Sequence, residues 1–271
     1  MIKGTLGPVE RVMARDTWVV CGAVVVIVLL AGLYTVFGVG MSMTALDMTR
    51  MARPIGDPMS MGPGQVWTWQ YALLVFLMCW VMMIAMMTPS AAPTLLLYTA
   101  LKRHGGERAS SPALSLLFLA GYLVVWGGFS ALATGLQWLT QTLGVLDGPM
   151  MTLASRPAAG VVLILAGLFQ FSALKASCLK QCSSPAQFLT ENRRAGEWGA
   201  FVMGAHHGAF CFGCCWALMA LLFVGGIMNL YWIVGLAVYV LAEKVVPYPL
   251  ILSRLAGIGL IGLGAWCIAV T

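Results

Sequence analysis

The chain is 271 residues long, of which 61% are hydrophobic and 9% charged, with a net charge of +6 and a mean hydropathy of +0.91. A soluble domain of this size usually carries roughly 25% charged residues, so an aqueous fold has too few polar side chains to cover this much apolar surface. The charges cluster between apolar segments rather than on one face, which excludes nucleic acid as a partner and indicates a lipid bilayer.

Apolar runs recur along the chain at about 20 residues, the length of a helix that crosses ~30 Å of hydrocarbon. The first run is too long for a signal-peptide core and no small-residue cleavage site follows it, so we keep it in the mature protein. Lipid offers backbone amides no partner, and each span is therefore expected to be helical. The sequence predicts an all-α polytopic membrane protein with about seven transmembrane helices, at about 17–40, 66–88, 112–137, 158–177, 201–226, 229–246 and 252–270.

No repeat, low-complexity tract or linker divides the chain, so we expect a single transmembrane helical domain over residues 1–271. Only three of the fifteen Lys and Arg residues, Arg50, Arg53 and Arg156, fall on one side of the predicted spans. The positive-inside rule places the other, richer side in the cytoplasm. This orientation predicts a short cytoplasmic N-terminal tail at about 1–16, a Met-rich periplasmic loop at about 41–65 and a periplasmic C-terminus.

The second span contains two prolines, Pro89 and Pro93, beyond which the chain continues apolar to about residue 103. Each proline removes a backbone donor and clashes with the preceding turn, so we expect either a kink or break here or a simple end of the helix. Broken backbone at membrane depth is tolerated where it is buried in protein or lines a cavity.

The fifth span, GAHHGAFCFGCCW, holds the strongest chemical signal. His207, Cys211, Cys214 and Cys215 recur at i, i+4, i+7 and i+8 on one helical face, with His206 beside it. Imidazole and thiolate together are ligands for Cu(I) or Zn(II), and ionisable groups inside a membrane span indicate function. The alternative is packing, because free cysteine also behaves as a small buried hydrophobe and glycines let helices approach closely.

Three weaker features accompany this stripe. Cys178 and Cys182 share a face at the end of the fourth span, where a reducing compartment favours a reactive thiol or a metal ligand over a disulfide. Met82 and Met86 recur at helical spacing in the second span, as a thioether surface for Cu(I) or as flexible core filler. Six methionines also lie between Met41 and Met61, for copper capture or for packing on the membrane surface.

Counted along the helices at ~1.5 Å per residue, the His/Cys stripe, the Cys178–Cys182 pair and the methionines of the second span fall in the cytoplasmic half of the bilayer, with Cys211 close to its midplane. Glu243, near the inner end of the sixth span, is a nearby acidic candidate. We expect one site to gather these residues if the second, fourth, fifth and sixth helices pack together.

Several segments resemble a bacterial family of predicted metal-binding integral membrane proteins, a domain of unknown function. The resemblance covers about residues 66–247 and is carried by PSAAP, GYLVVWGGFS, LKASCLKQCSSP, GAHHGAFCFGCCWALMALLFVGGIMN and LAEK. It implies the bacterial inner (cytoplasmic) membrane and a bound metal, and it supplies no reaction. The positions that it implies as ligands are Cys178, Cys182, His207, Cys211, Cys214 and Cys215.

The leading hypothesis is a membrane protein that binds a soft metal, copper with zinc as the alternative, for transport or delivery. A second is a metalloenzyme or thiol oxidoreductase that uses the same cluster. A third is a non-catalytic subunit that packs against a membrane-protein partner or a second copy of the chain.

Overall fold

The computed structural model describes residues 8–38, 44–50, 67–104, 110–143, 146–147, 152–153 and 155–270. The described chain is helical apart from one antiparallel pair of two-residue strands. In chain order the elements are α1 (Pro8–Phe37), α2 (Ala45–Arg50), α3 (Trp69–His104), α4 (Ser111–Thr142), β1 (Leu146–Asp147), β2 (Thr152–Leu153), α5 (Arg156–Phe169), α6 (Ala173–Ser183), α7 (Pro185–Glu191), α8 (Gly196–Ala220), α9 (Leu222–Gly225), α10 (Leu230–Val245) and α11 (Pro249–Ala269).

Five helices among the described residues are long and apolar enough to cross a membrane, at Val19–Phe37, Trp69–Arg103, Ser111–Thr142, Gly196–Gly225 and Pro249–Ala269. The α5–α6 pair makes a sixth if it counts as one span, although it bends by 64°. The prediction of a helical chain with membrane-length helices is confirmed. The count of seven is not reached, because α10 has only 16 residues and a full span takes about 20.

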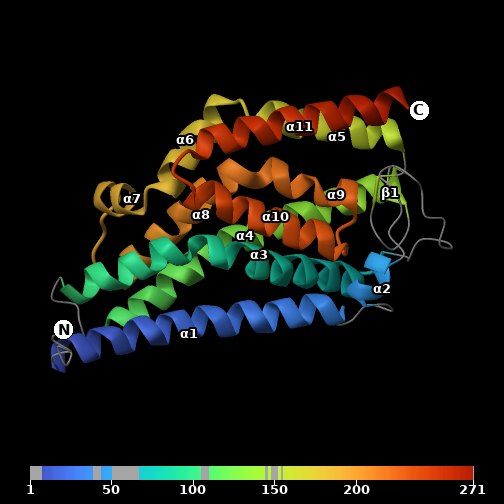
Figure 1. The fold of residues 1–271 in the computed structure, drawn as a ribbon. Helices are drawn as coiled ribbons and strands as arrows, with labels where there is room; N and C mark the ends of the chain where they lie inside the picture. Colours follow the sequence, from blue (N-terminus) through green and yellow to red (C-terminus); the bar gives the residue numbers. More distant parts are fainter. Residues whose placement is uncertain are drawn as a thin grey trace, which may run out of the picture.

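Consecutive long helices run back and forth along one axis, and the two termini lie at opposite ends of the bundle (Figure 1). The helix α1 packs along α3, and α4 packs along both α3 and α8. The helices α5 and α11 pair with each other at the upper side of the bundle in Figure 1, while α6 and α10 contact both α8 and one another.

The second predicted span is longer than expected, because α3 continues through both prolines for 36 residues. A break or a stop at Pro89 and Pro93 is therefore wrong, whereas a kink within the continuous helix stays a prediction. Neighbouring hydroxyls bond to the backbone on this stretch: Thr88 donates to the Ile84 carbonyl at 2.6 Å and Ser90 to the Met87 carbonyl at 2.9 Å. Packing of the flanking turns against other helices holds α3 together across the lost donors.

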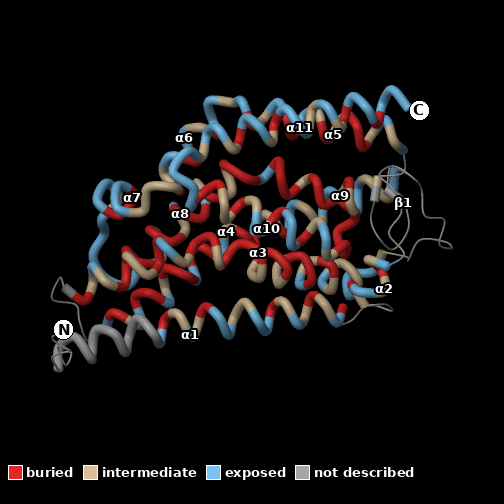
Figure 2. Tube along the Cα trace, viewed as in Figure 1, coloured by how far each residue is buried: buried red, intermediate tan, exposed pale blue. Residues whose placement is uncertain are grey.

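Polar groups lie inside the bundle and large apolar side chains lie on its surface. Figure 2 shows long exposed stretches along α1 and α11, whereas buried residues are more frequent along α3, α4 and α8. Leu30 on α1 and Leu132 on α4 are exposed, whereas Lys175, His207 and Glu243 are buried. This arrangement suits a lipid environment outside and a polar site within.

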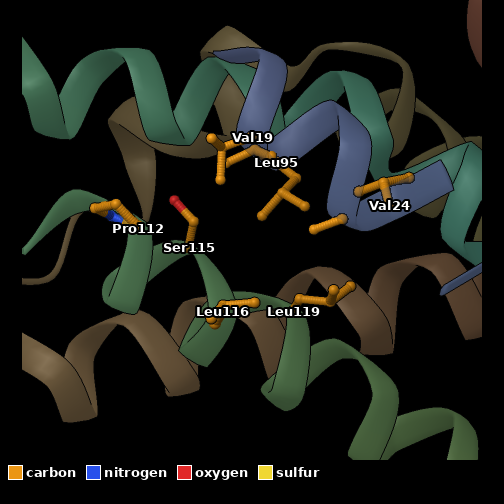
Figure 3. A pocket seen from close by; sticks show the side chains of 9 residues that line it. Val19, Val24, Leu95, Pro112, Ser115, Leu116 and Leu119 are labelled. Carbon is orange, nitrogen blue, oxygen red and sulfur yellow. The ribbon is translucent and has the colours of Figure 1, made fainter. Parts of the chain in front are cut away.

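A cavity of about 80 Å³ lies between α1, α3 and α4 (Figure 3). Its lining is almost wholly apolar and includes Val19, Leu95 and Leu119, with the Ser115 hydroxyl as the polar group that Figure 3 labels. No cysteine or histidine lines it, so this hollow is separate from the predicted metal-binding residues.

Candidate metal centre

Four buried cysteines from two helices meet in the interior of the bundle. Cys182 of α6 lies beside Cys214 of α8, and the thiols of Cys214 and Cys215 donate to the Cys211 carbonyl at 3.1 and 2.9 Å. All four are free thiols with at most 3% of their surface exposed. The structure thus places four of the predicted ligands near one another, and they offer the soft sulfur atoms that Cu(I) prefers.

The sequence between α5 and α8 places α6 against this cluster. The Ser172 hydroxyl accepts from the Lys175 backbone N–H at 3.1 Å and begins a new helix after α5. The new direction directs Cys178 and Cys182 toward α8. A Cβ on Gly213 would lie 2.7 Å from the Cys178 sulfur, so the glycine lets this thiol lie directly against α8.

Glycines also hold α4 against α8. A Cβ on Gly204 would collide with the Phe118 carbonyl oxygen, and one on Gly121 would collide with that of Phe201. A Cβ on Gly208 would lie 3.1 Å from the Tyr122 carbonyl oxygen. Because the two helices approach at backbone distance, the Tyr122 side chain reaches across to α8.

The Cys211 sulfur is the centre of a polar network between four helices. It lies 3.1 Å from the Tyr122 hydroxyl of α4 and 3.0 Å from the Lys244 ammonium of α10. Tyr122 also donates to the Met87 carbonyl of α3 at 3.0 Å, and Lys244 donates to the Ser90 hydroxyl at 2.9 Å. The Lys244 ammonium therefore donates to this sulfur, and a cationic donor at this distance favours the thiolate.

His207 is fully buried one turn before Cys211 on the same face of α8. Its ring lies among those of Phe118, Tyr122 and Phe188, with centroid distances of 5.0–6.0 Å. Neither ring nitrogen has a hydrogen-bond partner within the described residues. A buried imidazole without partners is costly, and a metal ion that took one nitrogen as ligand would remove part of that cost.

Other predicted site residues lie at the edge of the cluster or away from it. His206 is exposed, and its ring lies near Phe210 at a centroid distance of 4.8 Å. Met82 and Met86 are buried in α3, on the turns before the Met87 carbonyl that Tyr122 contacts. The MSM motifs of the predicted Met-rich loop lie outside the described residues; within that loop, Met48 of α2 is buried.

Glu243, predicted as an acidic member of the site, is bound elsewhere. Its carboxylate accepts from the Lys175 ammonium at 2.8 Å and from the Tyr239 hydroxyl at 2.7 Å. Both Lys175 and Glu243 are almost completely buried. The pair ties α6 to α10 beside the cysteines, and both charges belong to the interior rather than to a loop.

The cluster is not a finished coordination sphere. Within the described residues, no group of three or more His, Cys, Asp or Glu side chains has the geometry to hold a metal ion. In these positions at most two such side chains would hold a metal ion. Thioether ligands, or rotation of further thiol side chains, would complete the coordination. Cu(I) accepts few, soft ligands, whereas Zn(II) sites in proteins use three or four.

Sequence reasoning missed Tyr122 and Lys244, which contact the Cys211 sulfur, and Ser90, which accepts from Lys244. Lys244 was counted among the cytoplasmic charges that orient the chain, and its position in the last turn of an apolar helix was the available signal. Tyr122 sits beside Gly121, and a glycine next to a tyrosine within a span indicates close approach to another helix. Nothing local distinguished Ser90 from other small residues.

Comparison with known proteins agrees with this chemistry. No curated protein and no solved structure matches the chain significantly. A family model described as PpoB2, copper chaperone, matches residues 76–267, a stretch that begins in α3, ends in α11 and contains the whole cysteine cluster. The chain, with its buried thiols in a bundle of membrane-length helices, belongs to the PpoB2 copper chaperone family.

Proposed function

We propose that this chain is a multi-pass protein of the bacterial inner membrane that binds Cu(I) at the cysteine cluster and delivers it to a partner. The observation that carries this proposal is the convergence of four free thiols from α6 and α8 in the bundle interior, beside a buried imidazole without partners. The family match supports copper as the cargo.

The donor set favours a soft ion. Cys182, Cys211, Cys214 and Cys215 supply sulfur, and His207 supplies a neutral nitrogen one turn away. Met82 and Met86 are candidate thioether ligands, buried on the helix that contacts Tyr122 and Lys244. Hard, oxygen-preferring cations find one carboxylate here, that of Glu243, which Lys175 and Tyr239 already occupy.

The placement of the cluster suggests a route for transfer. In Figure 1 the α3 helix extends further toward one end of the bundle than the connection between α10 and α11 does. Residues 245–248 of this connection are exposed, directly after the buried Glu243 and Lys244. In the proposed orientation this end faces the cytoplasm, so Cys178 and Cys182 would exchange copper with a cytoplasmic partner. The Met-rich loop at about 41–65 would capture the ion on the other side.

The test is metal content. The wild type and the Cys211→Ala/Cys214→Ala/Cys215→Ala variant are purified anaerobically in detergent, loaded with Cu(I) or Zn(II), and analysed by mass spectrometry. We expect about one copper per wild-type chain and loss of copper in the variant, since thiolates are the principal Cu(I) ligands. Cys267→Ala is the matched control, because Cys267 is also a buried cysteine but lies on α11.

Each outcome separates the competing hypotheses. Copper that is lost in the triple variant but kept in the Cys267 variant supports the proposal. Equal copper in all three proteins contradicts the assignment of the site. A wild type that takes up no metal, and that purifies with a stoichiometric membrane partner, replaces the proposal with the packing subunit.

A further inference from the structure

A positive charge is built into the cysteine cluster. The Lys244 ammonium lies 3.0 Å from the Cys211 sulfur and 2.9 Å from the Ser90 hydroxyl, and the residue is 8% exposed. Burying an ammonium inside a membrane protein is costly unless it is paired or used. The groups nearest to the Lys244 ammonium therefore indicate which negative charge it compensates.

The nearby carboxylate does not neutralise Lys244. Glu243 is bonded to Lys175 and Tyr239, and that pair has no net charge. No carboxylate pairs with Lys244 in the part of the chain that the structure describes. The counter-ion of Lys244 is therefore the cysteine cluster, with Cys211 as its direct partner.

The charge of the loaded site depends on the metal. Two thiolates around one Cu(I) carry a net charge of −1, which the Lys244 ammonium brings to zero. Two thiolates around a divalent ion are already neutral, and Lys244 then leaves one uncompensated positive charge. Isolated charge is strongly disfavoured in a low-dielectric interior, so the same lysine favours one ion and disfavours the other.

We propose that Lys244 is a specificity-determining residue that makes the cysteine cluster selective for a monovalent soft ion over divalent ions. This inference rests on the proposed function, that the cluster binds metal. The neutral donors His207, Met82 and Met86 add no charge and leave the balance unchanged. Lys244 acts through repulsion of the bound ion, which is twice as strong for a divalent cation as for a monovalent one.

The experiment measures a ratio of affinities. Cu(I) and Zn(II) affinities are determined by competition with chelators for the wild type, Lys244→Met and Lys244→Arg. The ratio cancels whatever both metals share, including effects of the variant on folding and on thiolate formation. A unit charge ~6 Å from the ion at an effective dielectric constant of ~20 predicts that the Cu(I) preference falls about 100-fold in Lys244→Met. It should stay near the wild-type value in Lys244→Arg.

A second variant neutralises the charge of Lys244 without replacing the lysine. Ser90→Asp places a carboxylate against the Lys244 ammonium, where the Ser90 hydroxyl now lies at 2.9 Å, and should lower the Cu(I) preference in the same direction. If either variant binds both metals with the wild-type ratio, Lys244 does not set selectivity, although the copper site stands. A wild type that binds no Cu(I) instead overturns the proposed function itself.

Discussion

Glycines allow close helix contact at both the α4–α8 and the α5–α11 interface, but the side chains beside those glycines differ. Gly121 and Gly204 bring α4 and α8 to backbone distance, as Gly160 and Gly264 do for α5 and α11. At α4–α8 the close approach brings Tyr122 onto Cys211. At α5–α11 the glycines face backbone and isoleucine side chains, those of Ile164 and Ile268 among them. Glycine spacing therefore indicates where helices touch, and the neighbouring side chains decide whether the contact contributes polar groups to a site.

The two interfaces also differ in their position in the bundle. Of the most apolar window in Gly196–Gly225, 56% is buried, against 22% in Pro249–Ala269. The helix α8 is thus enclosed by α4, α5, α6 and α10, whereas α11 presents most of its surface outward. A polar site needs this enclosure, since lipid cannot solvate it.

The largest effect is expected at the ion pair that holds α6 and α10 around α8. Glu243→Gln leaves the buried Lys175 ammonium without its carboxylate, which should lower the free energy of unfolding by about 3–5 kcal/mol. Thermal unfolding in detergent measures this loss. The double variant Lys175→Met/Glu243→Gln removes both charges and should recover most of the stability.

The matched control is Glu191→Gln on α7, whose carboxylate accepts from Gln181 and Gln187 on the exposed surface. It should unfold at close to the wild-type temperature, because exposed polar contacts contribute little. If the double variant is no more stable than Glu243→Gln alone, the pair does not act as a charge-compensated unit.

A smaller and more selective effect is expected from alanine at matched glycines. Gly204→Ala and Gly264→Ala each add one methyl group against a backbone carbonyl, that of Phe118 or Gly160, and each should cost about 1–3 kcal/mol of stability. Only Gly204→Ala should also lower copper binding, because it moves α4 and Tyr122 away from Cys211. Copper content and unfolding temperature, measured on both proteins, separate the two effects. Equal copper loss in both variants would mean that the α4–α8 interface has no special relation to the site.

Much of the fold follows from local sequence patterns. Apolar runs of membrane length predicted the long helices, because lipid leaves a single backbone solution. The prolines of α3 were misread, since local chemistry favours a break where tertiary packing on both flanks maintains the helix. The bend between α5 and α6 was also missed, because the Ser172 cap resembles any polar residue within an apolar run.

The candidate site was predictable only along α8 and in part along α6. Periodicity places His207 and Cys211 on one face, but it carries no information about the side chains that other helices bring to them. Lys244 is the clearest case: counting it as a loop charge is sound in general, and here its place in the last turn of the short α10 buries it. The partners of the Cys211 sulfur on other helices, Lys244 and Tyr122, lie 33 and 89 residues away in the chain.

The smallest expected effect tests whether the α4–α8 interface, unlike α5–α11, contributes a polar group to the copper site. Tyr122→Phe keeps the ring beside His207 and removes the hydroxyl that contacts both the Cys211 sulfur and the Met87 carbonyl. The loss of one buried hydrogen-bond donor should lower the free energy of unfolding by about 1 kcal/mol and change the Cu(I) affinity about fivefold. Chelator competition measures the affinity.

Tyr231→Phe, on the exposed face of α10, is the control and should change neither quantity. If Tyr122→Phe loses stability but binds copper as the wild type does, Tyr122 serves packing, and the α4–α8 interface differs from α5–α11 only in the size of its side chains. If copper affinity changes with stability intact, the hydroxyl acts on the Cys211 sulfur itself. The glycines that admit Tyr122 are then part of the copper site, although none of them touches the ion.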